Sequence, residues 1–565
     1  MRNWSASRFQ RLSAVDGLAV VGVALVVLVV FLDEPHVLPR TGDVLNLSPS
    51  MLPRYAAYSL LRMLAAYALA LGFALGAGYW ASASPLGRRL ILPALDLLQA
   101  VPILGFFPAA VFFFIRVFHG AAIGIEAAAV FLIFTSQAWN MAFSVYESLT
   151  TIPDDLRTAA RVSGVSGVVL WRRLLLPACA SRLVYNSMLS WAGGWYFLIA
   201  SEIIAVGQST WVLPGLGSYV GQSITLGRFG LTAAGLLSLV GLITLLHIVV
   251  WSPLEAWSER FRYETSAAGE RTVPLVRTLL RRAPLVRRAL TRMGRRLGSG
   301  LGRLAAVASH VLSRTWVLPL AALGALAALS GLVYGAVQTI EVLVRPLPAE
   351  AATIPSALFF SFLRLLVAYG ISLAWTVPLA CWISLSGRRA ARVMPVVQVL
   401  ASVPATAFFP ILVLAVLRLG FNLNVSAVAL VLTGMQWYLL FNLVAAAQAM
   451  PEDLRELARA TGAGGLFYLR RFFLPAALPS LVTGSLTAWG GGWNALVLAE
   501  CVTAGGRTWS VRGIGTLLDE ATYVRGDLQM ITLVIVSMVT AVLLLNRAVW
   551  RPLYAWASVR FRLDA

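Results

Sequence analysis

The sequence contains no lysine, and charged residues of every kind occupy only 12% of its 565 positions. Soluble proteins carry about 25% charged residues. Hydrophobic residues instead reach 59%, and the mean hydropathy is +0.80. A core in water cannot hide this much apolar surface, which argues against a soluble enzyme and favours the bilayer as solvent. The patterning of transmembrane β-strands is also missing, so we expect helices.

Patterns that carry catalysis or metal binding are absent as well. The cysteines Cys179, Cys381 and Cys501 are scattered and include no CxxC pair, so neither a disulfide framework nor a zinc site is expected. The four histidines show no HExxH or clustered spacing. The Gly-x-x-x-x-Gly-Lys-[Ser/Thr] loop is missing, so the chain does not hydrolyse ATP in the P-loop manner. We therefore expect no catalytic residue, no metal and no cofactor on this chain.

The net charge of +21 comes entirely from arginine. Nucleic-acid binding is one interpretation of such a charge. The arginines, however, lie in particular loops rather than on one folded basic domain. We attribute them to the positive-inside rule and to anionic lipid headgroups, and we expect no nucleic-acid partner.

The sequence repeats itself after 298 residues. Residues 151–177 read TIPDDLRTAARVSGVSGVVLWRRLLLP, and residues 449–475 read AMPEDLRELARATGAGGLFYLRRFFLP. A repeat of this length indicates one duplicated domain rather than a short-period solenoid. Each copy is polar within a very apolar chain. The duplication therefore suggests a pair of docking sites for something in the water phase.

Many charge-free runs are long enough to cross a hydrocarbon core about 30 Å thick, which takes roughly 20 residues. We predict about twelve transmembrane helices, six in each repeat, in an all-α polytopic membrane protein. Those of the first repeat are expected at 15–32, 59–82, 88–116, 121–147, 180–205 and 229–251. Those of the second are expected at 315–338, 360–384, 391–417, 423–449, 478–503 and 527–547.

The distribution of arginine predicts the orientation in the membrane. Arg2, Arg8 and Arg11 precede an uncleaved first span, and the two repeated loops are also arginine-rich. We therefore expect the N-terminus and both loops to be cytoplasmic. Because six is an even number of spans, the two repeats are expected to be parallel, related by an axis along the membrane normal.

The domain boundaries follow from the same pattern. We predict a first repeat at 1–262, a cytoplasmic linker at 263–313 and a second repeat at 314–565. The joining stretch 252–314 carries thirteen arginines against four glutamates. It is either a regulatory or docking arm, or a tether whose basic face rests on anionic lipid, and we favour the tether.

Each repeated loop is predicted to contain a short amphipathic helix. Pro153 and Pro451 stand where the first turn begins, and acidic residues follow them. Proline suits the first helical position, and acids suit the positive end of the helix dipole. Gly164 and Gly462 are placed to end the helices. Small residues between these limits leave a surface that another protein could approach closely.

At these loops the chain resembles the permease subunits of ABC importers. Their cytoplasmic loop reads Glu-Ala-Ala, three residues, Gly, and a stretch ending in Pro. The first copy lacks the acid and the second has Leu for the first Ala. The resemblance implies that the helices couple to an ATP-binding subunit. The implied coupling residues are Asp155, Arg157, Thr158, Ala159, Ala160 and Gly164, and Asp453, Arg455, Glu456, Ala458 and Gly462.

A second stretch narrows the resemblance. Residues 190–217 read SWAGGWYFLIASEIIAVGQSTWVLPGLG, and residues 488–515 read AWGGGWNALVLAECVTAGGRTWSVRGIG. This Trp-rich fifth span, with Glu near its end and a later Gly-[Leu/Ile]-Gly, resembles the branch that imports nitrate, sulfonates, taurine and related small anions. The chain looks like a fused, duplicated version of such a permease.

The resemblance implies a function and a set of partners. We expect the permease of an ATP-driven importer for a small anion, embedded in the bacterial inner membrane. Two ABC ATPase subunits would carry ATP and Mg, and an external binding protein, periplasmic or lipid-anchored, would deliver the solute. A secondary transporter with parallel repeats and no ATPase is the main alternative, and a membrane scaffold or sensor is another.

The same spacing of residues on the fifth span of both repeats predicts residues of the translocation path. Trp191, Trp195 and Glu202 share one helix face, and Trp489, Trp493 and Glu500 repeat the spacing. The direction of the spans puts Arg62 and Arg364 near the same outer ends. Since an ionisable group inside a span is costly and usually paired, we expect Arg62 to pair with Glu202 and Arg364 with Glu500. Direct contact with an anion and snorkelling to headgroups are the alternatives.

Other intramembrane polar residues do not all recur in both repeats. Among them are Gln99, Asn140 and Asn494. Most are expected to make interhelical hydrogen bonds. Those that do not recur would make the path asymmetric, which a fused chain permits and a homodimer does not.

Overall fold

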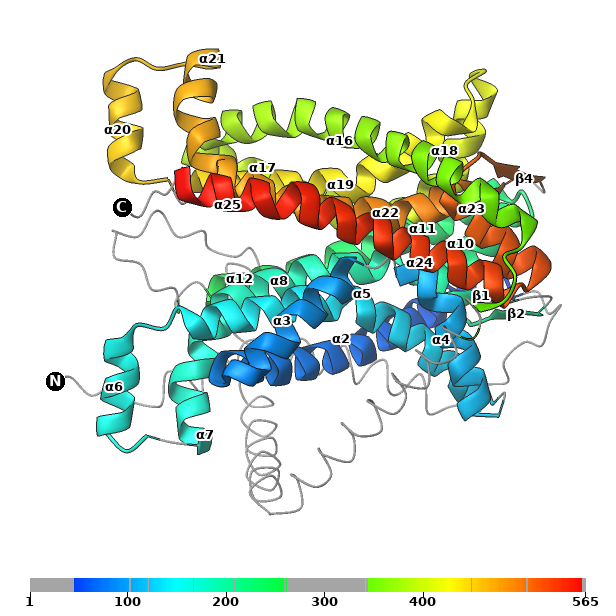
Figure 1. Cartoon of the computed structure of the whole chain (residues 1–565), viewed down its shortest axis with the longest axis horizontal. Coiled ribbons are helices and arrows are strands. Elements are labelled where there is room, and N and C mark those ends of the chain that lie inside the picture. The colour runs from blue at the N-terminus through cyan, green and yellow to red at the C-terminus, as the bar shows by residue number, and fades with distance from the viewer. Residues whose placement is uncertain are drawn as a thin grey trace.

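The computed structural model (Figure 1) describes most of both repeats. The described residues are 45–100, 103–119, 121–165, 167–206, 209–258, 261, 341, 344–448, 450–504 and 507–560. The predicted spans at 15–32 and 315–338 and the predicted linker at 263–313 lie outside these residues.

In its described part, the first repeat consists of helices and one β-hairpin. Its helices are α2 Leu52–Ala83, α3 Pro85–Ala100, α4 Ile103–Val117, α5 Ala122–Thr150, α6 Asp154–Val162, α7 Gly167–Leu170, α8 Leu176–Tyr196, α9 Leu198–Glu202, α10 Leu216–Thr225, α11 Phe229–Leu246 and α12 Ser252–Ser258. The hairpin is β1 Ile203–Val206 with β2 Ser209–Val212, and a 3₁₀ turn at Pro49–Met51 precedes α2. π-helical segments at Trp171–Leu175 and His247–Trp251 join α7 to α8 and α11 to α12.

The second repeat follows the same order. Its helices are α16 Ile354–Ser384, α17 Gly387–Ser402, α18 Ala405–Arg418, α19 Leu423–Gln448, α20 Glu452–Ala460, α21 Gly465–Tyr468, α22 Leu474–Ala499, α23 Ile514–Asp519, α24 Leu528–Leu545 and α25 Arg551–Arg560. The hairpin is β3 Cys501–Ala504 with β4 Arg507–Ser510. A 3₁₀ turn lies at Ala349–Thr353, and π-helical segments lie at Leu469–Phe473, Glu520–Arg525 and Asn546–Trp550.

The fold is that of an all-α polytopic membrane protein. Seven helices of the described part are long and apolar enough to cross a bilayer. Their outward faces carry large apolar side chains such as Leu237 and Leu544, which are 72% and 62% exposed. Such exposure is unfavourable in water and natural in lipid.

Close helix packing within each repeat depends on small residues. Along α2, the fully buried Ala66, Ala70 and Ala74 form a small-residue stripe. Gly78 continues it, and a Cβ there would come within 2.7 Å of Val145 on α5. Small residues let membrane helices approach closely, since van der Waals contact replaces the hydrophobic drive that lipid removes.

The third span of the second repeat is broken, so the continuous helix expected at 391–417 is wrong. In the second repeat, α17 ends at Ser402 and α18 begins at Ala405, with Val403 and Pro404 in extended conformation between them. Proline has no N–H to donate and pushes the preceding residue out of the α region. In the first repeat, α3 ends at Ala100 and α4 begins at Ile103, and residues 101–102 lie outside the described residues.

The fifth span also ends differently from the expectation. The helices predicted at 180–205 and 478–503 stop at Glu202 and Ala499. In each repeat, the chain then forms a two-stranded antiparallel hairpin. Ile203 pairs with Val212 in the first hairpin, and Cys501 pairs with Ser510 in the second. Short helices α10 and α23 follow the hairpins.

Segments of the third and fifth spans interlock the two repeats. The buried Ala407 of α18 belongs to the apolar core of the first repeat. Val497 and Leu498 of α22 pack against the core that surrounds α4. In Figure 1, α6 and α7 lie at the same end of the molecule as α20 and α21, while both hairpins lie at the opposite end. The arrangement is therefore pseudo-symmetric, since equivalent elements of the two repeats lie at the same end of the molecule.

Candidate functional site

The repeated loops fold into the short helices expected of them. α6 begins after Pro153 and α20 after Pro451, both of which are extended (ψ 139° and 141°) and occupy the capping position just before the helix. Acidic residues follow at once, Asp154 and Asp155 in the first turn of α6. The predicted start of both helices is confirmed, with proline one position earlier than the first helical residue.

Each helix ends in a Schellman motif centred on its glycine. Gly164 and Gly462 adopt φ of +64° and +63°. The Val165 N–H donates to Ala160 O at 2.9 Å, and the Gly164 N–H donates to Arg161 O at 3.0 Å. The same pair of bonds recurs at Gly462, where Ala463 N–H donates to Ala458 O. Glycine adopts this left-handed conformation without the penalty of a Cβ.

One arginine braces each helix against the span before it. The Arg157 guanidinium donates to Leu149 O, and that of Arg455 donates to Ala447 O at 2.9 Å. The acceptors belong to the last turns of α5 and α19. Orphan carbonyls at a helix end are thereby satisfied, and the angle between span and short helix is fixed.

The predicted coupling residues lie mainly at the surface. Asp155, Thr158, Ala159, Gly164, Asp453, Glu456 and Gly462 are exposed, Arg157, Ala160 and Arg455 are half-buried, and Ala458 is buried. Apolar side chains are exposed as well, with Val162 at 84% and Leu457 at 51%. No residue of α6 is buried. Both helices thus present a mixed polar and apolar surface with no covering element in the described part of the chain.

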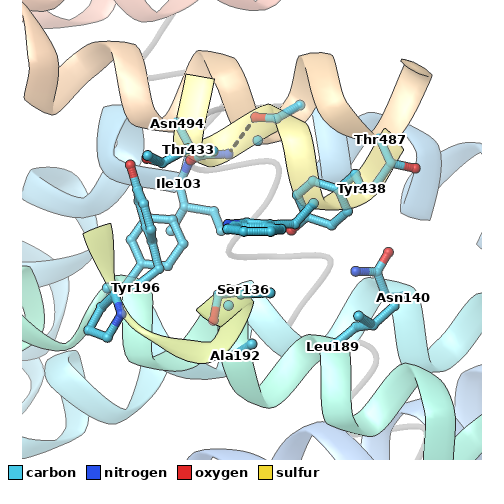
Figure 2. A pocket seen from close by; sticks show the side chains of 18 of the residues that line it. Ile103, Ser136, Asn140, Leu189, Ala192, Tyr196, Thr433, Tyr438, Thr487 and Asn494 are labelled. Atoms are coloured by element: carbon cyan, nitrogen blue, oxygen red, sulfur yellow. Dashed lines mark hydrogen bonds between the residues drawn. The ribbon is translucent and has the colours of Figure 1, made fainter. Parts of the chain in front are cut away.

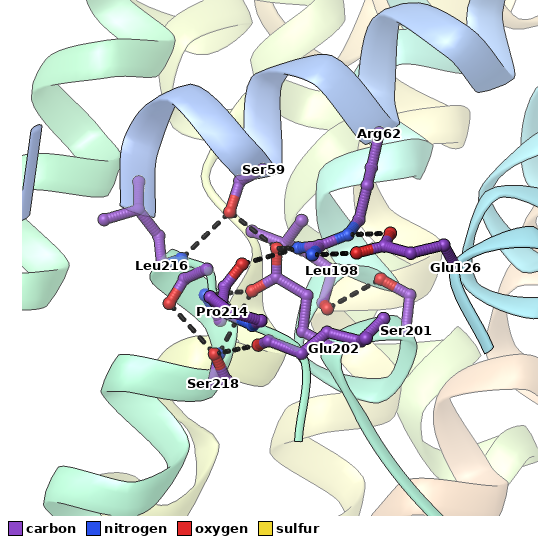
Figure 3. Close-up of polar contacts among 12 residues, drawn as sticks. Ser59, Arg62, Glu126, Leu198, Ser201, Glu202, Pro214, Leu216 and Ser218 are labelled. Atoms are coloured by element: carbon purple, nitrogen blue, oxygen red, sulfur yellow. Dashed lines mark hydrogen bonds and ion pairs between the residues drawn. The ribbon is translucent and has the colours of Figure 1, made fainter. Parts of the chain in front are cut away.

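The expected ion pair of the first repeat is present at the opposite end (Figure 3). Arg62 donates to Glu202 Oε1 at 2.9 Å and, through two nitrogens, to both carboxylate oxygens of Glu126 at 2.7 Å. Glu202 is fully buried and also accepts from the Ser59 hydroxyl at 2.6 Å and the Gly217 N–H at 2.7 Å. The carboxylate therefore ties α2 to the start of α10.

The second repeat carries the same pair with one carboxylate fewer. Arg364 donates to Glu500 Oε1 at 2.6 Å, and its Nε donates to Asn424 Oδ1 at 2.8 Å. Asn424 takes the place of Glu126. Glu500 accepts from Ser361 at 2.6 Å and from the Gly515 N–H at 2.7 Å. Both predicted pairings, Arg62 with Glu202 and Arg364 with Glu500, are confirmed.

The glycines of the Gly-[Leu/Ile]-Gly motifs make room for these carboxylates. A Cβ at Gly215 would overlap the carboxylate of Glu202, and one at Gly513 would overlap that of Glu500. The motif is therefore explained by close approach of backbone and carboxylate at the base of each hairpin.

The tryptophans of the fifth spans pack inside their own repeats. Trp191 meets Tyr67 and Trp251 with ring centroids 5.6 and 5.8 Å apart. Trp489 repeats this with Tyr369 and Trp550, at 5.7 and 6.0 Å. Trp195 and Trp493 are at most 1% exposed. These rings form the aromatic core of each repeat.

A cavity of about 130 Å³ lies between the repeats (Figure 2). Its walls come from α5 and α8 of the first repeat and α19 and α22 of the second, with residues at the facing ends of α3 and α4 and of α17 and α18. None of the eight predicted path residues (Trp191, Trp195, Glu202, Trp489, Trp493, Glu500, Arg62 and Arg364) lines it, although Trp489 and Trp493 border a smaller cavity of about 40 Å³.

The residues that do line the central cavity have amide, hydroxyl and aromatic side chains. They include Gln99, Asn140, Tyr196, Thr433, Trp437, Tyr438 and Asn494. The helix-face argument chose the tryptophan side of the fifth span, whereas the cavity lies on the side of Gly193 and Gly490. Three of these polar residues stood out in the sequence only as intramembrane polar groups that do not recur in both repeats.

Comparison with known families identifies this architecture. The family model described as "Binding-protein-dependent transport system inner membrane component" matches the chain twice, at residues 68–252 and 367–551. These matches cover more than half of the chain and fall one in each repeat. The chain belongs to this family of membrane transport permeases, with two family domains in one polypeptide.

Individual relatives are similar over shorter stretches. The nitrate import permease protein NrtB of Leptolyngbya laminosa is 32% identical over 155 residues, 27% of this chain and 52% of the relative. The bicarbonate transport system permease protein CmpB of Synechococcus elongatus is 30% identical over 186 residues, 32% of this chain and 63% of the relative. A probable ABC transporter permease of Brucella melitensis is 25% identical over 148 residues, 26% and 56% respectively. The chain thus spans about half the length of the curated relatives it matches.

Proposed function

We propose that this chain is the permease subunit of an ATP-driven ABC importer for a small anion of the nitrate, bicarbonate, sulfonate or taurine kind. The observation that carries the proposal is the pair of exposed, Schellman-terminated helices α6 and α20 at one end of the molecule. The names of the relatives NrtB and CmpB support the anion class.

In this proposal two ATPase subunits bind, one at each short helix. They hold ATP and Mg, and this chain contributes neither catalytic residues nor a cofactor. The arginine braces support this role, because Arg157 and Arg455 link α6 and α20 rigidly to α5 and α19. Closure of the ATPases would draw the two helices together. The spans would then move as rigid bodies and switch access to the central cavity from one side to the other.

An external binding protein would deliver the solute at the end that carries the hairpins. The N-terminus and both short helices would lie on the cytoplasmic side of the inner membrane. The arginine content of the loops supports this orientation, and the family description supports the location in the inner membrane. A secondary transporter remains the rival, and it would need no ATPase.

The test is retention of an ATPase by the chain purified from native membranes in mild detergent, followed by mass spectrometry. The variants Ala159→Glu and Leu457→Glu place charge at equivalent exposed positions of α6 and α20. Both together are expected to release the ATPase. The matched control Leu226→Glu changes a side chain that is 50% exposed after α10, and it is expected to retain the ATPase.

Two outcomes would contradict the proposal. One is a wild-type preparation with no P-loop ATPase even after crosslinking. The other is equal retention by the double variant and by the control. Uptake that proceeds in vesicles without ATP would favour the secondary transporter.

A further inference from the structure

The walls of the central cavity are symmetric in backbone position but not in chemistry. The offset of 298 residues pairs Trp139 with Trp437, which are identical. The same offset pairs Asn140 on α5 with Tyr438 on α19, and Tyr196 on α8 with Asn494 on α22. All of these residues line the cavity. Amide and phenol groups have therefore been exchanged between the repeats at equivalent positions.

Several polar groups on these walls have no hydrogen-bond partner within the described part of the protein. Gln99 Nε2 donates to Asn140 Oδ1 at 3.3 Å, which leaves the Asn140 Nδ2 as a donor without an acceptor. The Tyr196 hydroxyl and the Trp139 indole N–H are buried without a hydrogen-bond partner among the described residues. The Tyr438 hydroxyl, which also lines the cavity, makes no hydrogen bond to a described residue. Figure 2 places Asn140 and Tyr196 on the side of the first repeat and Tyr438 across from them. Buried donors without partners are costly unless water or a ligand fills the site.

Asn494 behaves differently, and the contrast is informative. Its Oδ1 accepts from the Ile103 N–H at 2.5 Å, and its Nδ2 donates to Gly490 O at 3.0 Å. This amide is satisfied by the protein and holds the start of α4. At the two exchanged positions, the groups without a partner are therefore Asn140 and Tyr196 in the first repeat and Tyr438 in the second.

The cavity offers these donors without a fixed charge. No charged side chain is among the described residues that line it. An arginine in the wall would bind an anion tightly and hold it. Conduction requires binding that is strong enough for entry and weak enough for release. Neutral donors suit a small ion whose single charge is spread over several oxygens, and about 130 Å³ holds such an ion with a few waters.

We infer that this cavity is the solute site, and that it binds a small, singly charged oxyanion through the neutral donors of Asn140, Tyr196 and Tyr438 in one orientation. The solute class rests on the proposed function. The single orientation follows from the asymmetry, because two identical units would present every donor twice and offer two equivalent poses. Specificity is thus assigned to the positions at which the duplicated halves differ.

The first test measures binding by the purified chain alone, so that it does not depend on an ATPase. The thermal unfolding temperature is compared in sodium nitrate, sodium bicarbonate, sodium sulfate and sodium chloride at equal ionic strength. We expect nitrate or bicarbonate to raise it relative to chloride, since a ligand that binds only the folded state stabilises it. Sulfate, with two charges, is expected to give no such rise.

Variants locate the effect. Tyr196→Phe removes one hydroxyl and Asn140→Leu removes one amide, and both are expected to abolish the rise. The matched controls Tyr185→Phe and Asn186→Leu change the same residue types on α8 outside the cavity, and they are expected to keep it. In the assembled transporter, the KM for uptake in Tyr196→Phe is expected to increase by roughly tenfold, the loss of one hydrogen bond to a charged group.

The inference is overturned if no oxyanion raises the unfolding temperature of the wild type, if sulfate does so as well as nitrate, or if Tyr196→Phe and Asn140→Leu keep the rise. Failure of the proposed function gives a different result. The chain would then bind nitrate or bicarbonate through these residues but retain no ATPase.

Discussion

The two buried ion pairs provide a comparison within one chain, because they differ by a single carboxylate. Arg62 contacts both Glu202 and Glu126, whereas Arg364 contacts Glu500 and the neutral Asn424. The substitutions Glu202→Gln and Glu500→Gln keep the shape of the side chain and remove one charge. The first leaves Arg62 with a carboxylate partner, and the second leaves Arg364 with none among the described residues.

The expected magnitudes follow from this difference. Arg364 and Glu500 are 7% and 0% exposed. Removing one partner of a buried ion pair costs about 3–5 kcal/mol, because the other charge is left uncompensated. In the first repeat Arg62 keeps its two bonds to Glu126, so Glu202→Gln loses mainly one hydrogen bond to a charged group, about 1.5–3 kcal/mol. Glu500→Gln is therefore expected to be the more destabilising substitution by about 1–3 kcal/mol.

The measurement is unfolding of the purified protein in mixed micelles of increasing SDS content. Asn424→Glu rebuilds the arrangement of the first repeat, and in the Glu500→Gln background it is expected to recover much of the loss. Conversely, Glu126→Asn is expected to make Glu202→Gln as damaging as Glu500→Gln. Equal losses for the two single variants, together with no recovery by Asn424→Glu, would refute the reasoning.

Three further predictions concern other parts of the structure. Gly215→Ala places a Cβ into a buried carboxylate and is expected to lower the unfolding free energy by about 1–3 kcal/mol. Gly241→Ala, in open space on α11, is expected to raise the unfolding free energy by about 0.5–1 kcal/mol. An equal response of the two variants in SDS titrations would contradict this prediction. Arg455→Met removes the hydrogen bond to α19 and is expected to weaken ATPase retention about fivefold in pull-down titrations. The free energy of unfolding in SDS is expected to change by no more than about 1 kcal/mol. Asn140→Arg adds a fixed charge to the cavity and is expected to lower both the KM and the maximal rate of nitrate uptake by about tenfold. A lower KM with an unchanged maximal rate would count against weak binding by neutral donors.

The ion pairs were predictable because the bilayer restricts what a charged side chain can do. An arginine and a glutamate in spans of opposite direction, both near the outer end, have few partners other than each other. The second carboxylate on Arg62 was not predicted, since Glu126 begins a different span and has no counterpart in the second repeat. The short helices α6 and α20 were predictable for a local reason: proline, acids and glycine mark their ends within a dozen residues.

The break in the third span of the second repeat had a visible signal that was outweighed by hydrophobicity. Pro404 stands in the middle of an apolar run, and apolar length alone favours one continuous helix. The hairpins were signalled by β-branched residues on either side of a glycine-containing pair, but a membrane setting favours helix as the default. The cavity had no local signal, because its walls combine residues nearly 400 positions apart on several helices of both repeats.

The hydrogen bond from the Ile103 N–H to Asn494 has a consequence for how the protein is made. The two residues are separated by 391 positions. At a synthesis rate of about 5–20 residues per second, Asn494 emerges from the ribosome about 20–80 s after Ile103. During that interval the first repeat is already in the membrane with a backbone donor that lacks its acceptor. Biogenesis therefore includes an intermediate in which the first repeat is inserted but lacks this contact. A chain truncated before α22 is expected to remain in this state and to be degraded by membrane quality control.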